Sequence, residues 1–392
     1  GEGTWFAQHR SVFPSTTRTA SASLATGCLP RQHGLHGNRV VLSEGAGLVA
    51  LSTGGADFVP RWRAASGGTL QRPVLAQRLA AHGGAEIFSN ASAGAAMLQD
   101  PDGHGTLYNR SGSHGPGGHS LPAGRHLDVP KGAAGDALTA ERFCAEALRE
   151  DGPALAVLWV SEPDNTGHKV PLGSPEHLAV LAATDACVGL VLERLGELGA
   201  GEEELLALFT SDHGQETTHR SIDVDQALLD AGLKASLDSQ ELIAASQGSA
   251  VLFYLAPEAW SRQEALLEWL DEQEWVETMH HGPGLEQVGL PDVPPLAVAV
   301  DMKKHAGTNE FGVPGRSDIM LDRSDPARYN GFGQHGGFGR YEQSPFLIAL
   351  GGGFAPGIHV DANSTPIDLA PSVLRHLGLP VENLDGKALP QG

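Results

Sequence analysis

Residues Ala154–His168 read ALAVLWVSEPDNTGH, an unbroken apolar run that passes directly into a polar loop. A short apolar run without alternation is typical of a strand covered on both faces of its sheet. Similar runs occur at Ala85–Phe88, Leu205–Thr210 and Phe346–Leu350. Together these segments predict the central strands of a mostly parallel sheet.

Longer segments rich in Ala and Leu, with apolar residues at helical spacing, separate the strands. Alternation of such helices with buried strands is typical of the α/β class. The segment Gly103–Gly124 is rich in Gly, Ser and His and predicts an irregular surface loop. The helices are expected at Thr19–Ala25, Val74–Ala81, Ala137–Arg149, Glu176–Leu198 and Asp368–Leu377.

The length of 392 residues exceeds the usual size of one domain, so more than one structural unit is expected. Between about Thr218 and Gly331 the pattern changes. A Trp-containing helical segment at 257–275 precedes a Gly/Pro-rich run at 282–295. We therefore expect an inserted subdomain at 219–330 within a core formed by 1–218 and 331–392.

The charge balance restricts the partners of the protein. The chain carries 26 basic and 47 acidic residues, a formal net charge of −21. Phosphate backbones are bound by clustered Lys and Arg, so no nucleic-acid polymer is predicted as a partner. No apolar run approaches the roughly 18–20 residues of a membrane span, and no membrane partner is predicted either.

The cysteines and the first residues of the chain give information on the cellular location of the protein. Cys28, Cys144 and Cys187 are too few and too scattered for a disulfide framework, which favours the cytoplasm. The chain opens with Gly1-Glu2-Gly3, without an initiator Met or a signal pattern. We expect it to begin after processing or partway through a longer gene product, which leaves a periplasmic or secreted location open. The sequence gives no prediction of oligomeric state.

Acidic residues and histidines directly follow two predicted strands. Asp164 and His168 come after the 154–160 strand, and Asp212 and His213 come after the 205–210 strand. Loops at the carboxyl ends of parallel strands converge on one crevice, and carboxylate with imidazole suits zinc or a similar ion. His335, between glycines in Gly333–Gly337, adds a third loop.

Each of these residues also has a plainer interpretation. An Asp after a strand is often a turn former or helix cap, and a His beside glycines is often merely exposed. Their occurrence together favours a metal site. Other histidines lack a partnered carboxylate at a strand end and are expected at the surface: His104, His114, His119, His280 and His281.

A cluster of hydroxyl residues, Phe13–Ser21, lies where a helix is expected to begin. Its backbone N–H groups would bind phosphate, and metal coordination would ease the loss of a hydroxyl proton. Simple capping of the helix by Ser15 or Thr16 is the alternative. Spacing alone does not choose among Ser15, Thr16, Thr17 and Thr19.

With these residues assembled, the chain resembles the type I phosphodiesterase/nucleotide pyrophosphatase family of the alkaline phosphatase superfamily. The resemblance covers most of the chain apart from the inserted region. It implies an alkaline-phosphatase-like three-layer α/β sandwich with a mostly parallel central sheet and an inserted cap. Five motifs in the family's order carry it: Phe13–Arg18, Thr26–Asn38, Glu162–Asp164 with Gly167-His168, Ser211–Gly214 and Gly333–Gly336.

The resemblance also implies roles for individual residues. Thr17 is the implied nucleophile, which forms a phosphothreonine, and Asn38 the implied donor to a non-bridging phosphate oxygen. Two divalent ions, with Zn²⁺ as the favoured metal, would lie about 4 Å apart and clamp the attacking and leaving oxygens. Asp164, His168 and His335 are implied as ligands of one ion; Asp212, His213 and the Thr17 oxygen are implied as ligands of the other. The implied substrate is a small phosphorylated molecule, with a nucleotide as one option.

The sequence departs from the family pattern in two places. The family places another metal-binding aspartate on its first strand, upstream of the nucleophile, whereas no Asp precedes Asp57 here. We therefore expect that this chain lacks the first strand and one metal ligand through truncation. In addition, Arg18 stands where many members carry an aromatic residue beside the nucleophile; it either contacts phosphate or points to solvent.

Rival functions differ in what they require. A sulfatase needs a Cys or Ser nucleophile, and Thr17 stands at that place. Phosphonoacetate hydrolase shares the threonine and the metal set and is the enzymatic alternative, while a metal-poor, non-catalytic relative is the alternative outside enzymes. In the inserted region, Lys303, Lys304, His305 and Asn309 either contact the substrate or form a solvated basic loop.

Overall fold

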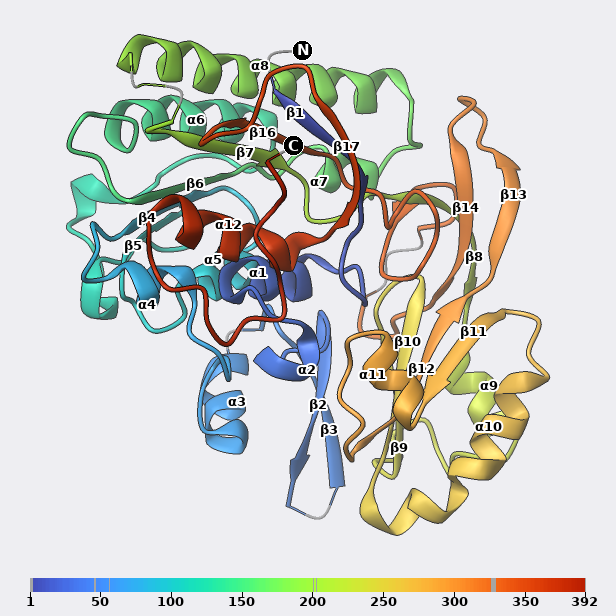
Figure 1. The fold of residues 1–392 in the computed structure, drawn as a ribbon. Helices are drawn as coiled ribbons and strands as arrows, with labels where there is room; N and C mark the ends of the chain where they lie inside the picture. Colours follow the sequence, from blue (N-terminus) through green and yellow to red (C-terminus); the bar gives the residue numbers. More distant parts are fainter. Residues whose placement is uncertain are drawn as a thin grey trace.

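A computed structural model of the chain describes residues 3–45, 47–55, 57–199, 201, 203–325 and 329–391. Its upper half, as drawn in Figure 1, is a three-layer α/β sandwich, and its lower half holds further sheets and helices. The α/β class and the three layers predicted from the sequence are thus confirmed.

The central layer consists of two sheets. In the first, strand order is β5-β4-β6 and both pairings are parallel. In the second, the order is β17-β1-β16-β7; β1 pairs with β17 in parallel, and β16 is antiparallel to both its neighbours. The strands are β4 (Ala85–Ser89), β5 (Thr106–Asn109), β6 (Leu155–Trp159), β1 (Thr4–His9), β7 (Leu206–Thr210), β16 (Leu347–Gly351) and β17 (His359–Ser364).

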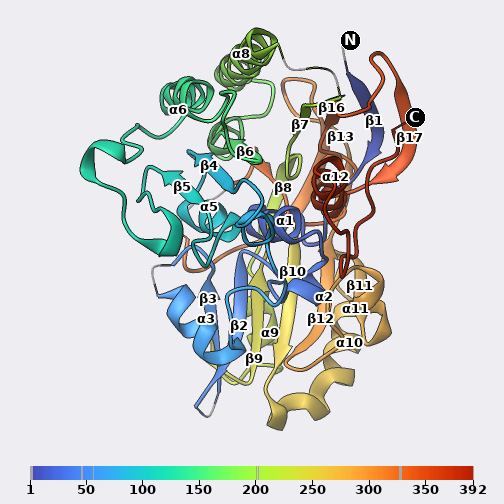
Figure 2. The same cartoon turned by 60° about the vertical axis from the view of Figure 1, so that its left-hand side comes forward.

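Helices cover both faces of the central layer, as Figures 1 and 2 show from two directions. On one face, α6 (Ala133–Glu146) and α8 (Pro175–Leu198) pack over β4 and β5, where Phe143 meets the stacked rings of Phe88 and Tyr108. The other face is covered by α1 (Thr17–Thr26), α4 (Leu75–Leu79), α5 (Ala93–Gln99) and α12 (Leu369–His376).

The ends of these helices follow from local sequence. In α8, the Ser174 side chain accepts the His177 amide N–H, Pro175 occupies the first helical position and Gly199 ends the helix with a φ of 60°. Gly27 ends α1 with a φ of 69°. A residue with a Cβ is strained in that left-handed conformation, so glycine stops both helices cleanly.

The lower half of the molecule, as drawn in Figure 1, is built on a four-stranded sheet and a hairpin. Apolar residues of the sheet β11-β12-β10-β9 pack on one face against α9 and α10. On the other face they pack against the hairpin β2–β3 and α11. A further sheet, β13-β14-β8-β15, has its labelled strands β13, β14 and β8 above this one, on the right of Figure 1.

The bounds of the remaining elements are as follows. The strands are β2 (Arg39–Glu44), β3 (Gly47–Ser52), β8 (Glu216–Ile222), β9 (Leu242–Ser246), β10 (Ala250–Leu255), β11 (Val276–His281), β12 (Leu296–Met302), β13 (Lys304–Thr308), β14 (Pro314–Met320) and β15 (Gly333–Gln334). The helices are α2 (Pro30–His33), α3 (Phe58–Ser66), α7 (Asp164–Gly167), α9 (Val224–Asp230), α10 (Gln263–Asp271) and α11 (Pro283–Gln287).

The predicted elements can be compared directly with these bounds. All four predicted strands and all five predicted helices are present, most of them displaced at their ends by one or two residues and the start and end of α6 by three or four. The predicted loop 103–124 was wrong in part, because β5 lies within it and extends the parallel sheet. The strand at 346–350 is antiparallel rather than parallel to its neighbours. The proposed boundaries at 219 and 330 stay a prediction.

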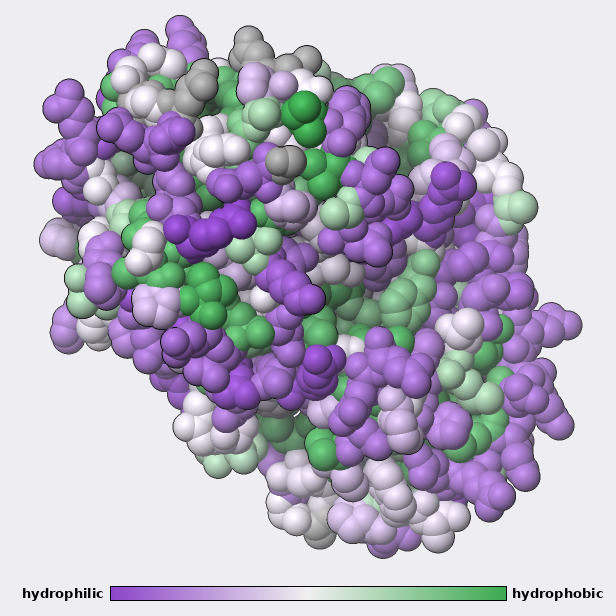
Figure 3. All heavy atoms as spheres, viewed as in Figure 1, coloured by the Kyte–Doolittle hydropathy of each residue, from purple (hydrophilic) through white to green (hydrophobic). Residues whose placement is uncertain are grey.

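The surface shown in Figure 3 is mostly polar. Polar residues cover most of the face shown in Figure 3, and apolar residues there form small scattered patches. Among the residues that the structure describes, no helix combines the length and hydrophobicity needed to cross a bilayer.

Asp136 on α6 ties this helix to the end of β6. Its buried carboxylate accepts hydrogen bonds from the Ser161 amide at 2.8 Å, the Ser161 hydroxyl at 3.1 Å and the Glu162 amide at 3.0 Å. The Asn90 side chain donates a fourth at 2.9 Å. One carboxylate thus anchors the start of the loop that carries Asp164.

We predict that Asp136→Ala lowers the free energy of unfolding by about 3 kcal/mol, because it leaves several buried donors without partners. Urea unfolding followed by circular dichroism measures this change. Asp128→Ala, at an exposed position, is the control and should change stability by less than about 0.5 kcal/mol. Equal stability of the two variants would contradict the anchoring role.

Candidate metal-dependent active site

Four segments far apart in the sequence bring their polar side chains together beside the central layer. Asp164 and His168 lie at the two ends of α7, just after β6, and Asp212 and His213 follow β7. His335 follows β15, and Thr17 is the first residue of α1. The structure therefore places in one site the six residues that the sequence analysis singled out as metal ligands.

Short contacts link these six residues. The Thr17 hydroxyl oxygen lies 3.1 Å from Nε2 of His213, and the same nitrogen lies 3.2 Å from Oδ2 of Asp212. The His213 ring stacks on that of His335, with centroids 3.5 Å apart. Oδ1 of Asp164 lies 3.2 Å from Nε2 of His168 and 3.7 Å from Nε2 of His335.

Backbone carbonyls determine which nitrogen of each imidazole faces this centre. Nδ1 of His168 lies 2.8 Å from the Gly333 oxygen, Nδ1 of His213 lies 2.9 Å from the Gly214 oxygen, and Nδ1 of His335 lies 2.7 Å from the Ser15 oxygen. A carbonyl only accepts, so each Nδ1 must carry the proton. In the neutral ring, Nε2 is then left with a free lone pair, as in metal-binding histidines.

Without a cation, these lone pairs oppose one another. Nε2 of neutral His213 and Oδ2 of Asp212 are both acceptors at 3.2 Å, and buried Oδ2 of Asp212 has no hydrogen-bond partner among the described residues. Such an arrangement requires a proton or a cation between the acceptors. The donor set therefore fits a divalent ion of the zinc type.

Burial and mutual charge shift the pKa values of the site. Burial and the nearby Asp164 carboxylate raise the pKa of Asp212 to about 7. Burial, and then His213, lower the pKa of His335 to about 3. Burial opposes ionisation of Asp164, but His168 and His335 hold its pKa well below its usual range. Asp164 is thus ionised at neutral pH, whereas Asp212 loses its proton only as the pH passes through about 7.

The structure does not divide these donors into two ion sites. Asp164, His213 and His335 each present a ligand atom within 4.8 Å of the others. His213, which lies 3.2 Å from Asp212, thereby also lies within reach of an ion held by Asp164 and His335. The assignment of particular residues to a first and a second ion remains an implication of the family resemblance.

Ser15 and Thr16 do not cap α1 with their side chains, contrary to the alternative considered for this cluster. Thr16 occupies the cap position but its hydroxyl pairs with that of Thr19 at 2.8 Å. The Ser15 hydroxyl accepts the Gly336 N–H at 2.9 Å and donates to the Gly337 carbonyl at 3.1 Å. Ser15 thus holds the glycine loop that positions His335.

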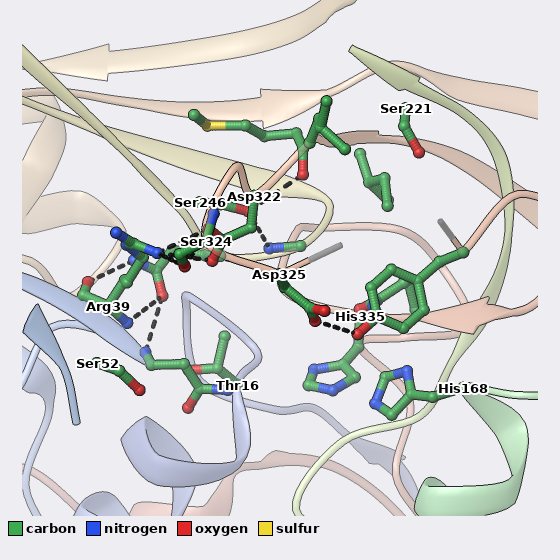
Figure 4. A pocket seen from close by; sticks show the side chains of 18 of the residues that line it. Thr16, Arg39, Ser52, His168, Ser221, Ser246, Asp322, Ser324, Asp325 and His335 are labelled. Atoms are coloured by element: carbon green, nitrogen blue, oxygen red, sulfur yellow. Dashed lines mark hydrogen bonds and ion pairs between the residues drawn. The ribbon is translucent and has the colours of Figure 1, made fainter. Parts of the chain in front are cut away.

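A pocket of about 420 Å³ opens beside the centre. Figure 4 shows His168 and His335 side by side at one end and Arg39 directed toward Asp322 at the other. Arg39 pairs with both oxygens of that carboxylate, at 2.7 and 2.8 Å. Other residues that line the pocket are Thr16, Arg18, Asn38, Ser52, Gln247, Ser324, Asp325 and Tyr329.

Asn38 lies in this pocket with its amide oriented. Its Oδ1 accepts the backbone N–H of Arg18 at 3.2 Å, so its NH₂ group is left to donate elsewhere. The Asn38 backbone N–H in turn donates to Oε1 of Gln247 at 2.8 Å. The turn before β2 is thereby fixed against the later sheet.

Sequence reasoning missed three residues of the site. Gln215 donates to Oδ1 of Asp164 at 2.8 Å, and its position next to Ser211–Gly214 was an available signal. No sequence signal indicated Gln247, which accepts the Asn38 N–H, or Tyr329. The Tyr329 ring contacts the His168 ring edge-on, with centroids 5.7 Å apart. Their roles arise from tertiary contacts with segments remote in sequence.

The basic stretch at 303–305 lies outside the pocket lining. Lys303 pairs with Glu277, Lys304 with Asp301 and Glu342, and His305 with Asp318. The expected solvated loop is instead the start of strand β13, whose side chains have carboxylate partners, while contact with the substrate stays a prediction. Asn309 donates to the Leu172 carbonyl at 2.7 Å.

Comparison with known proteins identifies the family of the chain. A sequence model of the family described as "Type I phosphodiesterase / nucleotide pyrophosphatase" matches residues 1–303. The chain belongs to this family of hydrolases, within the alkaline phosphatase superfamily. No curated protein sequence matches the chain significantly.

Similar solved structures include ectonucleotide pyrophosphatase/phosphodiesterase 5 from mouse, with a TM-score of 0.67 at 18% identity over 98% of this chain and 90% of that one. An inactive form of the mouse protein in complex with AMP gives the same values. The human counterpart gives a TM-score of 0.63 at 18% identity, with the same coverage. At this identity the likeness establishes the fold.

We predict that Zn²⁺ binding weakens by at least about tenfold for each pH unit below 7, because Asp212, with its pKa raised to about 7, must release a proton to a binding cation. Competition with a chromophoric chelator at pH 5.5, 6.5 and 7.5 measures this slope. In Asp212→Asn, Zn²⁺ binding should release one proton fewer, so the slope of the logarithm of affinity against pH should fall by about one. An unchanged slope in that variant would contradict the assignment.

Proposed function

We propose that the protein is a metal-dependent phosphodiesterase or nucleotide pyrophosphatase that acts through a phosphothreonine at Thr17. The observation that carries this proposal is the orientation of three imidazoles. Each donates Nδ1–H to a backbone carbonyl. Nε2 of His168 and of His335 faces Asp164, and Nε2 of His213 faces Asp212 and the Thr17 oxygen. This is a donor set for cations placed next to a nucleophile.

The chain's own residues account for the binding and orientation of the reacting groups. Asp164, His168, His335, Asp212 and His213 would hold two divalent ions, with Zn²⁺ best suited to the mixed O/N donors. When bound, such ions supply positive charge that lowers the pKa of a coordinated hydroxyl and neutralises phosphoryl oxygens. Thr17 is held at the start of α1, where free backbone N–H groups also favour negative charge.

Two displacements at phosphorus complete the proposed reaction. The Thr17 hydroxyl gives up its proton, which ends on the leaving group or in the solvent, and its oxygen forms a bond to phosphorus while the bond to the leaving oxygen breaks. Water then attacks the phosphothreonine from the opposite side, delivers its oxygen to phosphorus and returns a proton to Thr17. The oriented NH₂ group of Asn38 donates to a non-bridging oxygen in both steps.

The pocket supports a nucleotide as the substrate class. Its volume of about 420 Å³ lies within the range of small-molecule sites, and Tyr329 provides an aromatic side chain beside the ion site. The mouse structure with AMP shows a nucleotide in a related fold.

We also propose a cytoplasmic location, in keeping with three free, buried cysteines.

We predict that full-length protein with Zn²⁺ hydrolyses an aryl phosphodiester, and that Thr17→Ala lowers kcat by at least about 10³-fold because the nucleophile is removed. Release of nitrophenolate measures turnover, and elemental analysis confirms that the variant still holds metal. Thr17→Ser, which keeps a hydroxyl, should retain measurable activity. Unchanged turnover in Thr17→Ala would discredit the nucleophile.

A substrate panel separates the proposed function from its rivals. We expect phosphodiesters to be cleaved faster than a sulfate ester or phosphonoacetate under the same conditions. Preferential cleavage of phosphonoacetate would favour C–P hydrolysis. Absence of turnover on all substrates by metal-loaded, full-length protein would favour a non-catalytic relative.

A further inference from the structure

Arg18 directly follows the proposed nucleophile and lines the pocket that opens beside the metal site. Among the residues that the structure describes, no carboxylate pairs with its guanidinium, and its buried Nε has no hydrogen-bond partner. A desolvated charge of this kind is costly unless an anion accompanies it.

The contrast with Arg39 shows that the pocket does not leave cations unpaired in general. Arg39 lines the same cavity and forms two short contacts with Asp322. Its charge is thus neutralised within the chain. Arg18 is the pocket arginine whose counter-ion must come from elsewhere.

The guanidinium of Arg18 lies against two glycines. A Cβ added at Gly54 would lie 2.3 Å from Nη2 of Arg18, and one at Gly94 would lie 2.8 Å from its Nε. Two glycines therefore leave the room that this side chain occupies, on the turn after β3 and on the first turn of α5. The Arg18 backbone N–H is fixed as well, by Oδ1 of Asn38 at 3.2 Å.

We propose that Arg18 forms an anion subsite for a second negative charge of the substrate, carried on or next to the reacting phosphoryl group. This inference rests on the proposed function and specifies its substrate class. Two kinds of phosphate compound meet the requirement: a phosphate monoester, with two charges on the reacting phosphorus, and a nucleoside polyphosphate, with a charged neighbouring phosphate. A singly charged diester with a neutral leaving group does not engage the subsite.

Two matched substrate pairs test the subsite and separate its two sources. Nitrophenyl phosphate is compared with methyl nitrophenyl phosphate, and a nucleoside triphosphate with the nitrophenyl ester of the same nucleoside monophosphate. In Arg18→Gln, kcat/KM for the doubly charged member of at least one pair should fall roughly 10- to 100-fold, while that of its singly charged partner changes less than threefold. The pair that responds identifies the source of the charge.

Two further variants serve as controls. Arg18→Lys keeps the charge and should restore part of the lost discrimination within the responding pair. Arg39→Gln removes a cation that Asp322 already neutralises, so it should alter both members of each pair by similar factors. An equal loss on all four substrates in Arg18→Gln would overturn the subsite.

Equilibrium binding gives a readout that does not depend on turnover. Calorimetry of pyrophosphate, methyl phosphate and dimethyl phosphate with metal-loaded Thr17→Ala should show that adding Arg18→Gln weakens pyrophosphate or methyl phosphate by 10-fold or more and leaves dimethyl phosphate nearly unchanged. If adding Arg18→Gln leaves the affinity for all three probes unchanged, the subsite is refuted. Failure of wild-type protein to cleave any substrate would instead refute the proposed function, whatever the binding result.

Discussion

Three hydrogen bonds from imidazole Nδ1 atoms to backbone carbonyls are the constraint on which the rest of the site depends. The accepting carbonyls belong to Ser15, Gly214 and Gly333, which lie in three different loops. Because a carbonyl accepts only, each bond selects a tautomer as well as a ring orientation. Rotation of any one ring would point a proton, in place of a lone pair, at the centre.

Buried polar contacts from the surrounding structure fix the loops that carry the metal-binding residues. Asp136 fixes the chain after β6, and Ser15 fixes the glycines around His335 with two hydrogen bonds. Glu342, fully buried, accepts the N–H groups of Gly337 and Gly339 and pairs with Lys304. These polar contacts are buried, where an unmade hydrogen bond costs most, so they define one arrangement of the ligands.

The sequence predicted the components of the site better than their surroundings. Long apolar runs identified β4, β6, β7 and β16, and an acid beside a histidine at two strand ends indicated a metal centre. Short polar strands such as β8 and β14, and the edge strand β5, carried no such signal. The contacts of Gln247 with Asn38 and of Arg39 with Asp322 also carried no signal, because the two residues of each contact lie 209 and 283 positions apart in the chain.

The hairpin β2–β3 has a consequence for biosynthesis. Its apolar side, including Val41 and Leu48, is buried against a sheet whose strands appear only after residue 242. While the ribosome makes the intervening two hundred or so residues, that side has no native surface to cover it. Nascent chains should therefore depend on holding chaperones, and substitutions that slow synthesis in this interval would raise aggregation without altering the finished enzyme.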